Sequence, residues 1–314
     1  MTSLRRLGTS DLHVFPLSLG GNVFGWTADE TRSFAVLDAY AAAGGNFVDT
    51  ADAYSQWVEG NEGGESETVI GRWLASRGNR SDILVATKAG AHHRHKGLKP
   101  ETVRAAAEES LRRLGTDRID LFYTHYDDES VPVEDIVTTL DALVKEGKVR
   151  AVAASNISAE RLRACLDFAE AENLTGYVAL QPHYNLVSRD TYEGPLQDTV
   201  ARAGLAAVPY YGLASGFLTG KYRPGRTVDS ARAHGPLELV GTERGQRVLA
   251  ALDRVAEAHD AEVASVALAW LAARPTVAAP IASARTAEQL PALLASVELR
   301  LTDEELTALT DASA

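Results

Sequence analysis

The sequence is poor in the features that mark secreted, membrane-bound and nucleic-acid-binding proteins. Its 314 residues include a single cysteine, Cys165, so no disulfide can form within the chain, which is typical of a reducing compartment. No stretch reaches the roughly 20 apolar residues of a membrane helix, and the N-terminus has no apolar run like that of a signal peptide. The net charge of −12 disfavours general binding to phosphate backbones. We therefore expect a cytoplasmic protein that binds neither membranes nor nucleic acid.

What the sequence does contain is a regular alternation of two kinds of segment. Short β-branched runs, nearly all apolar on both faces, alternate with longer stretches of helical period. Runs of the first kind are typical of strands buried on both sides of a parallel sheet. We predict strands at residues 15–19, 47–50, 83–87, 121–124, 149–154, 177–180, 205–209 and 277–281.

The segments between these runs carry start and stop signals of helices. Pro100 and Ser158 stand where helices are expected to begin, and Gly44 and Gly115 stand where they are expected to end. A helix is also expected near the C-terminus, where Thr302 precedes an acidic first turn. The predicted helices cover residues 29–43, 100–114, 132–148, 158–172 and the C-terminal LTDEELTAL segment.

Repeated strand–helix alternation favours a parallel sheet closed on itself, an eight-stranded β/α barrel formed by residues 1–314 as one domain. A turn at residues 9–11 is predicted to form a hairpin that caps one end of this barrel. The alternative is an open doubly wound sheet, which would normally carry a G-x-G-x-x-G turn after its first strand. The first predicted strand leads into LGGNVFGW, which does not match.

Ionisable residues end three neighbouring predicted strands. The second strand runs into Asp49, with Tyr54 in the turn beyond, and the next two end in Lys88 and His125. In β/α barrels the carboxyl ends of the strands carry the active site. Because an unpaired buried charge is expensive, Asp49 and Lys88 are expected to pair. A purely structural ion pair, with Tyr54 and His125 as bystanders, is the alternative at this point.

The four groups also form a coherent set for acid–base chemistry. A tyrosine hydroxyl has an ordinary pKa near 10, and a neighbouring ammonium lowers it. We expect Lys88 to lower the pKa of Tyr54 in this way, with Asp49 holding Lys88 in place. Tyr54 then serves as a proton donor, and His125 orients a substrate carbonyl by a hydrogen bond. Such a site polarises a carbonyl for hydride attack without a metal.

Several motifs in chain order resemble those of the aldo-keto reductase superfamily. NFVDTADAY, VATKAG and DLFYTHYDD look like its three catalytic segments, and AASNIS, LQPHYNLVSR, YYGLASGFLTGKY and PIASARTAEQL extend the similarity over the chain. The resemblance is to the branch that includes potassium-channel β subunits. It implies a catalytic tetrad and hydride transfer between NADP(H) and a small carbonyl or alcohol. The tetrad residues would be Asp49, Tyr54, Lys88 and His125.

The resemblance also implies a cofactor site. Ser155, Asn156 and Gln181 match positions that hold the nicotinamide carboxamide, and Tyr210 matches the aromatic residue that stacks on the nicotinamide ring. Small residues after Tyr210 would let backbone N–H groups approach the pyrophosphate. The guanidinium of Arg285 would meet the 2′-phosphate. The full expected set adds Gly21, Asn22, Asp49, Tyr211, Gly212, Leu213, Ser215, Gly216, Lys221, Arg232, Ser283 and the adenine contact Gln289.

The chain departs from the pattern of its relatives in several places. Tyr211, Gly212 and Leu213 stand where a Ser-Pro-Leu turn is usual, and Ser283 stands where many relatives carry glycine. A Glu-Asn pair expected after the adenine contact is replaced by Ala292 and Leu293. The turn after Tyr54, SQWVEGNEGGESE, is longer than usual and is expected to shape the substrate pocket, and residues 221–241 are expected to form a functional loop.

Other functions remain to be weighed. Three histidines close together, His92, His93 and His95, are candidate metal ligands, but the flanking charges and glycines favour a mobile, solvated loop. A cofactor-binding sensor or regulatory subunit with slow or vestigial reductase activity is the alternative to an active enzyme. An isomerase or lyase without nicotinamide would need no residue like Arg285. We expect no metal, and the sequence leaves the oligomeric state open.

Overall fold

The eight predicted strands form one parallel sheet in a computed structural model that describes residues 3–225, 228 and 234–314. The strands lie in the order β11-β10-β9-β8-β5-β4-β3-β12. From β3 to β11 each strand pairs with the next one of this sheet along the chain, the separate hairpin β6–β7 is inserted between β5 and β8, and β12 pairs with β3. The bounds are β3 (Ser18–Gly20), β4 (Phe47–Asp49), β5 (Leu84–Ala89), β8 (Ile119–Thr124), β9 (Val149–Ser155), β10 (Ala179–Gln181), β11 (Ala206–Ala207) and β12 (Ile281–Ala282).

Backbone hydrogen bonds join the two ends of this sheet. Ala207 N donates to Thr276 O at 2.8 Å, and Ile281 N donates to Pro209 O at 2.9 Å. These bonds connect β11 to the segment that leads into β12, so the sheet closes as the predicted β/α barrel. The last two strands are shorter than predicted, because Pro209 and Pro280 lack the N–H that a longer ladder would need.

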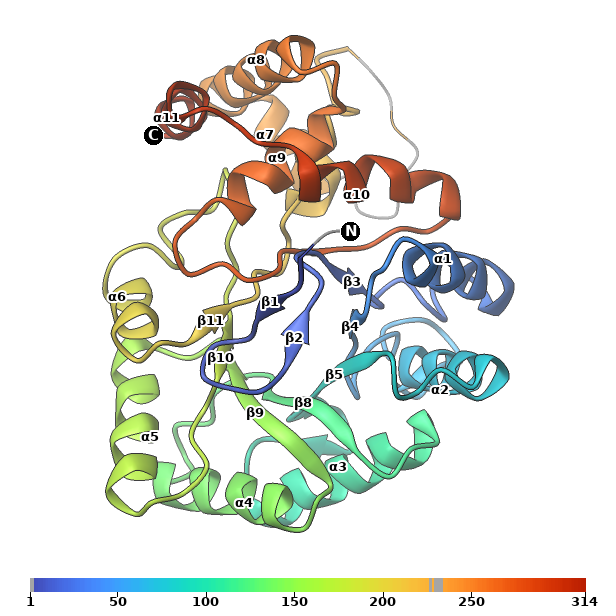
Figure 1. The fold of residues 1–314 in the computed structure, drawn as a ribbon, viewed down its shortest axis with the longest axis vertical. Helices are drawn as coiled ribbons and strands as arrows, with labels where there is room; N and C mark the ends of the chain where they lie inside the picture. The colour runs from blue at the N-terminus through green and yellow to red at the C-terminus, as the bar shows by residue number, and fades with distance from the viewer. Residues whose placement is uncertain (1–2, 226–227, 229–233) are drawn as a thin grey trace.

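Helices surround the sheet on its outside, with α1 to α6 along the sides and lower edge and α7 to α11 above it in Figure 1. The predicted capping residues Ser158 and Thr302 are confirmed, because the side chain of each accepts a hydrogen bond from a first-turn N–H. Asp29 caps the helix that follows it in the same way. The bounds are α1 (Glu30–Ala42), α2 (Glu65–Arg77), α3 (Pro100–Leu114), α4 (Val133–Lys145), α5 (Ala159–Ala171), α6 (Pro195–Arg202), α7 (His234–Val240), α8 (Glu243–Ala258), α9 (Val263–Ala272), α10 (Leu290–Glu298) and α11 (Asp303–Ala312), with short 3₁₀ turns η1 (Ala214–Thr219) and η2 (Ala287–Gln289).

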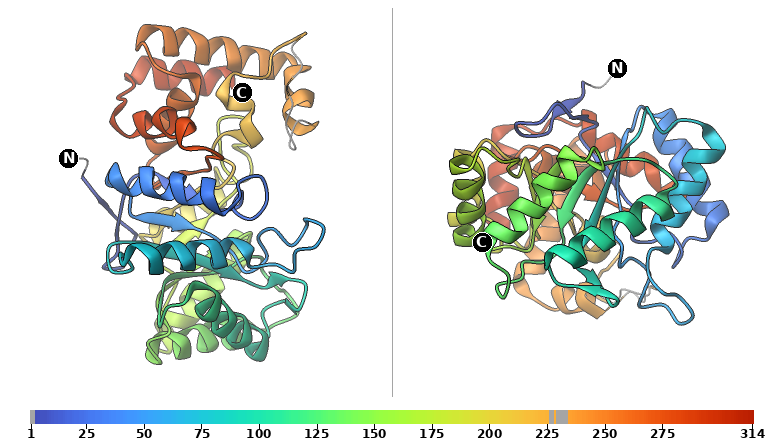
Figure 2. Two further views of the ribbon diagram at one scale, coloured as in Figure 1. Left: turned by 90° about the vertical axis from the view of Figure 1, so that its right-hand side faces the viewer. Right: turned by 90° about the horizontal axis from the view of Figure 1, so that it is seen from below.

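The predicted N-terminal hairpin closes one end of the barrel. It consists of β1 (Arg5–Arg6) and β2 (His13–Val14), and Leu7 packs inside the barrel in one cluster with Phe47 and Leu121. Gly8 has a φ of +55°, and a Cβ there would lie 2.0 Å from the carbonyl oxygen of Val178, so only glycine allows this approach. In Figure 2 the loops that follow β4 and β5 project from the opposite end.

The remaining interior is largely apolar, as the strand pattern predicts, and the buried carboxylates of Glu67 and Asp120 within it are paired with Arg113 and Arg80. Cys165, Trp73 and Trp270, each in a helix, are buried in the core between sheet and helices. In the described part of the chain, no helix combines the length and apolar composition that crossing a bilayer requires.

Candidate active site

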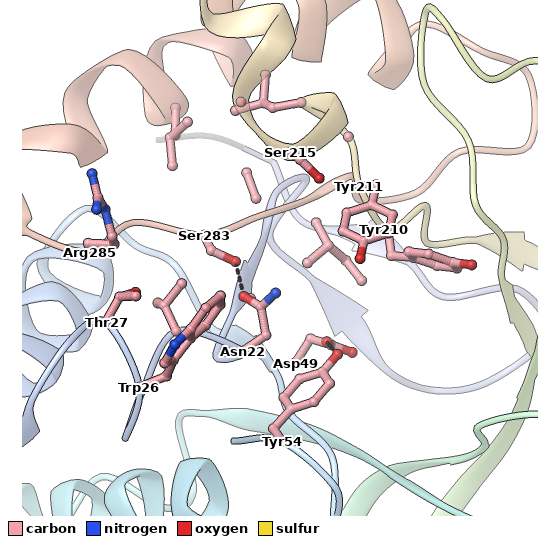
Figure 3. Close-up of a pocket in the computed structure, with 18 of the residues that line it drawn as sticks. Asn22, Trp26, Thr27, Asp49, Tyr54, Tyr210, Tyr211, Ser215, Ser283 and Arg285 are labelled. Atoms are coloured by element: carbon pink, nitrogen blue, oxygen red, sulfur yellow. Dashed lines mark hydrogen bonds between the residues drawn. The ribbon is translucent and has the colours of Figure 1, made fainter. Parts of the chain in front are cut away.

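A cavity of about 710 Å³ opens at the carboxyl ends of the strands, opposite the hairpin. The register of the sheet brings the predicted residues to this end, because Asp49 is aligned with Gly20 and Ala86, and Gln181 is aligned with Ser155. Most of the expected site residues line the cavity, and Figure 3 draws several of them. The side chains of Asp49 and Tyr54 lie at its floor, while Arg285 lies toward the far end.

The buried ammonium of Lys88 organises the floor of the cavity. Its Nζ donates to Asp49 Oδ2 at 2.8 Å, to the Tyr54 hydroxyl at 2.8 Å and to the carbonyl oxygen of Thr50 at 2.7 Å. The Tyr54 hydroxyl lies 3.3 Å from Asp49 Oδ2, and the His125 ring lies 6.1 Å from the Tyr54 ring, centroid to centroid. The expected pairing of Asp49 with Lys88 is confirmed, and the structure brings all four predicted groups to one point.

The pKa of Tyr54 moves in the direction opposite to the one expected. Burial, and then the charge of Asp49, raise the pKa of Tyr54 well above its usual range. The expectation that Lys88 lowers it was wrong, because the burial of Tyr54 and the neighbouring Asp49 carboxylate outweigh the ammonium of Lys88. Burial and the nearby Lys88 lower the pKa of His125 well below its usual range. At neutral pH Tyr54 is therefore a protonated phenol and His125 a neutral imidazole.

The raised pKa of Tyr54 has a consequence that can be measured on the protein alone. Raising the pH removes a tyrosine proton only near its pKa, and the Tyr54 pKa lies above the ordinary value of about 10. We expect the ultraviolet difference between wild type and Tyr54→Phe to show no phenolate below about pH 10. Phenolate appearing between about pH 7 and 9 would instead show that Lys88 dominates the environment of Tyr54.

The three residues expected to hold a carboxamide form a linked wall beside this floor. Gln181 Nε2 donates to Asp49 Oδ1 at 2.8 Å, and the hydroxyl of Ser155 donates to the carbonyl oxygen of Gln181 at 2.8 Å. Asn156 Nδ2 donates to His125 O at 2.8 Å, while Asn156 Oδ1 accepts a hydrogen bond from the Tyr210 hydroxyl at 2.8 Å. The wall is thus held in place by the same residues that form the floor.

The segment after Tyr210 has the backbone of an anion-binding loop. Tyr211, Ala214, Ser215 and Gly216 all have positive φ values, between 47° and 98°. Left-handed residues in such a loop turn backbone N–H groups to one side, as in phosphate-binding nests, while the N–H groups of Ala214 and Gly216 donate to Tyr211 O and Leu213 O within the loop. A Cβ on Gly216 would lie 3.2 Å from Lys221 Nζ, so this ammonium lies directly over the loop. The residues present therefore fit a pyrophosphate.

The other expected cofactor residues divide into three groups. The first group lines the cavity and consists of two hydrogen-bonded pairs. The Ser283 hydroxyl donates to Asn22 Oδ1 at 2.7 Å, and Arg285 N donates to Gln289 Oε1 at 2.8 Å. Gly21 does not line it, because its N–H donates to Asp49 O and a Cβ there would meet Ser66. Arg232 lies outside the described residues, and α7 occupies part of the expected loop at residues 221–241.

Aromatic residues that sequence reasoning missed or left open also line the cavity. From the sequence alone, Trp26 and Trp57 fit a pocket wall and plain packing equally well; both belong to the wall, and Gln56 of the long turn after Tyr54 also lines it. Tyr126 follows His125 directly, a signal that was available in the sequence. His183, also missed, is not a lining residue itself but stacks on Tyr210, which is, with ring centroids 5.3 Å apart.

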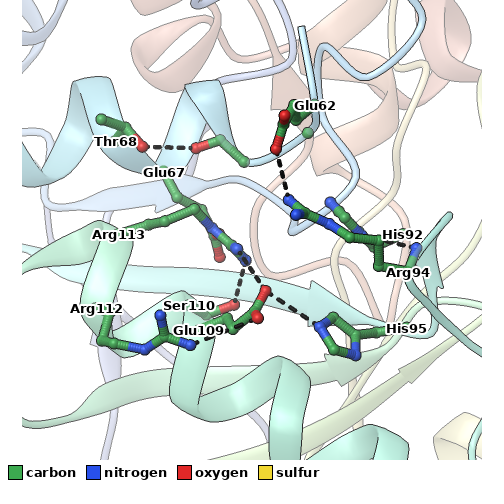
Figure 4. Close-up of polar contacts among 12 residues, drawn as sticks. Glu62, Glu67, Thr68, His92, Arg94, His95, Glu109, Ser110, Arg112 and Arg113 are labelled. Atoms are coloured by element: carbon green, nitrogen blue, oxygen red, sulfur yellow. Dashed lines mark hydrogen bonds and ion pairs between the residues drawn. The ribbon is translucent and has the colours of Figure 1, made fainter.

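The histidines after β5 lie in a hairpin, β6 (Ala91–His92) with β7 (His95–Lys96), rather than in a solvated loop. His92 is fully buried, because the long turn after Tyr54 covers it: a Cβ on Gly63 would lie 2.6 Å from its Nε2. His95 pairs with Glu109 at 3.1 Å (Figure 4). The expectation of a solvated loop was therefore wrong at His92. Within residues 3–225, 228 and 234–314, no group of three His, Cys, Asp or Glu is placed to hold a metal.

Comparison with known proteins agrees with this arrangement. Residues 16–314 match the aldo/keto reductase family model. The chain is 33% identical to norsolorinic acid reductase stcV of Emericella nidulans, over 96% of this chain and 78% of that protein. It is 31% identical to protein tas of Escherichia coli, over 96% of this chain and 94% of that protein. It is 30% identical to the NADP(+) aryl-alcohol dehydrogenase of Phanerodontia chrysosporium, over 96% of this chain and 83% of that protein.

The fold and these matches define a carbonyl oxidoreductase on a β/α barrel. The chain belongs to the aldo/keto reductase family, as its motifs predicted, and members of this family use nicotinamide cofactors.

Proposed function

We propose that this protein reduces an aldehyde or ketone with NADPH, or catalyses the reverse reaction, with Tyr54 as the proton donor. The observation that carries the proposal is the position of the Tyr54 hydroxyl, 2.8 Å from Lys88 Nζ at the floor of the cavity. The anion-binding loop and the Tyr210 ring line the same cavity, which supports binding of a dinucleotide beside this hydroxyl.

Each residue of the floor has a distinct part in the proposed reaction. When bound, the cofactor supplies the hydride that adds to the carbonyl carbon. Tyr54 gives its proton to the carbonyl oxygen, so that the C=O group becomes an alcohol. Lys88 stabilises the phenolate left behind, since its ammonium lies 2.8 Å away, and Asp49 holds Lys88 in position. Neutral His125 donates a hydrogen bond to the carbonyl oxygen and orients it.

The direct test of this function has two steps. NADPH binding is measured by fluorescence titration, and reduction of an aromatic aldehyde is then followed by the loss of NADPH absorbance. We expect saturable binding and steady turnover. A protein that does not bind NADPH, or binds it without reducing any aldehyde or ketone, would contradict the proposal.

We further propose that Arg285 selects NADPH over NADH by pairing with the 2′-phosphate. Its side chain lines the cavity at the end away from Tyr54, and a guanidinium forms forked hydrogen bonds with phosphate oxygens. The name of the fungal aryl-alcohol dehydrogenase, which specifies NADP(+), supports the same preference.

Replacing Arg285 by alanine is expected to weaken NADPH binding while leaving NADH binding nearly unchanged. A lost hydrogen bond to a charged group costs about 1.5–3 kcal/mol, so the Kd for NADPH should rise roughly 10- to 150-fold. Both dissociation constants are measured by fluorescence titration of wild type and Arg285→Ala. Equal losses for the two cofactors would contradict a role at the 2′-phosphate.

A further inference from the structure

Three half-exposed aromatic side chains stand at the mouth of the cavity. Trp57, Tyr126 and Tyr211 are 51%, 53% and 47% exposed, and all three line the cavity. Only two other large apolar side chains are comparably exposed in the described part of the chain, Leu4 and Leu237. Because large aromatic rings are normally buried, a group of them around one opening marks a surface that binds a partner or ligand.

The rings on one side of this mouth form a continuous row that includes Tyr54 and His125. Trp57 contacts Trp26 and Tyr54 edge to face, with ring centroids 5.5 Å and 6.3 Å apart. His125 contacts Tyr54 at 6.1 Å, and Tyr126 stacks on His125 at 4.9 Å with the planes 17° apart. Tyr54 and His125 are therefore each in ring contact with a half-exposed aromatic side chain. We call Trp57 and Tyr126 the aromatic rim.

The charges of the cavity lie elsewhere. The Asp49 carboxylate at the floor is already paired with Lys88. Lys221 lies over the anion-binding loop and Arg285 lies at the far end, which are the regions proposed for the cofactor phosphates. Glu262 directly precedes α9. The start of α9 lies beside α10, because the Ser265 hydroxyl donates a hydrogen bond to Ala292 O, so Glu262 is also away from the aromatic rim. Among the described residues, the rim thus offers aromatic faces and no cation for an anionic group.

We propose that the substrate is an uncharged carbonyl compound carried on a planar system of two or more rings, with its outer ring packed on Trp57 and Tyr126. This inference rests on the proposed function, because it places the carbonyl oxygen at Tyr54 and His125. The ring that bears the carbonyl lies next to these two groups. A further ring is needed to reach the aromatic rim, whose members lie one ring farther out.

The test compares 2-naphthaldehyde, its 6-carboxy derivative and butanal in wild type and in rim variants. Because aromatic pairs contribute beyond area burial, Trp57→Leu and Tyr126→Leu should each lower the ratio of kcat/KM for 2-naphthaldehyde to that for butanal by about tenfold. Trp57→Phe should restore most of this ratio. The 6-carboxy derivative should have a kcat/KM at least about tenfold below that of 2-naphthaldehyde in wild type, since none of the described residues of the aromatic rim is a cation that would receive its carboxylate.

Leu4→Ala is the matched control, because Leu4 is a similarly exposed apolar residue that does not line the cavity. It should leave the selectivity ratio unchanged. An unchanged ratio in both rim variants, or equal turnover of the carboxylated compound, would overturn the inference while leaving the proposed function in place.

Binding of 2-naphthaldehyde, measured by quenching of tryptophan fluorescence, separates the two proposals. Binding that Tyr126→Leu weakens, without turnover of any compound, would overturn the proposed function and support the aromatic rim. Turnover of these compounds, with binding of 2-naphthaldehyde unchanged in Tyr126→Leu, would support the proposed function and overturn the role of the aromatic rim.

Discussion

Tyr54→Phe is expected to abolish carbonyl reduction while leaving cofactor binding intact. General acid catalysis contributes about 10²- to 10⁴-fold, so kcat should fall by at least a hundredfold when the proton donor is removed. The ring remains, so its contacts with Trp57 and His125 are preserved. The NADPH dissociation constant should change by less than about twofold, which corresponds to roughly 0.4 kcal/mol. Steady-state kinetics and fluorescence titration give the two values.

The matched control for this variant is Tyr177→Phe. Tyr177 is buried between the barrel and its helices, where its hydroxyl lies 3.4 Å from Thr124 Oγ1 and away from the cavity. It tests whether loss of any buried tyrosine hydroxyl slows turnover. Wild-type kcat in Tyr54→Phe, or an equal loss in Tyr177→Phe, would contradict the assignment of Tyr54 as the donor.

Lys88→Met is expected to cost both stability and activity. Lys88 is completely buried, and its loss leaves the Asp49 carboxylate buried without its ionic partner. Removing one member of a buried pair typically destabilises a protein by about 3–5 kcal/mol, and this loss is measured as a change in the free energy of unfolding in urea. We also expect kcat to fall at least about a hundredfold, because the ammonium no longer stabilises the Tyr54 phenolate.

The double variant Asp49→Asn/Lys88→Met separates the two effects. With both charges removed, its destabilisation should be smaller than the sum of the single variants by about 1–3 kcal/mol. Its activity should stay as low as that of Lys88→Met, since the proposed role of Lys88 is lost in both. Recovery of activity together with stability would mean that Lys88 acts only by holding the fold together.

Much of the fold followed from local pattern. Strands buried on both sides are apolar throughout, and the alternation of such runs with helical stretches predicted the barrel. Ser158 and Thr302 predicted the starts of their helices, because an N-cap depends only on nearby backbone. The ends of β11 and β12 were less predictable, since their length depends on which N–H groups meet a partner across the closing seam.

The candidate site was predictable in its members but not in its electrostatics. Position at a strand end brought Asp49, Lys88 and His125 together, because parallel strands share one carboxyl edge. The pKa of Tyr54 depends instead on how completely it is buried and on its distance from Asp49. The burial of His92 likewise depends on tertiary contact, because the turn after Tyr54 folds over its side chain.

The sequence by itself determined the barrel, the order of its strands and the four polar groups at one edge of the sheet. These features depend on periodicity and on neighbours along the chain. Only the tertiary structure decided that Tyr54 is held as a protonated phenol, that Gly21 packs behind the site and that Trp57 and Tyr126 form an aromatic rim. Burial, distance and ring contact between segments far apart in the chain arise only when the barrel closes.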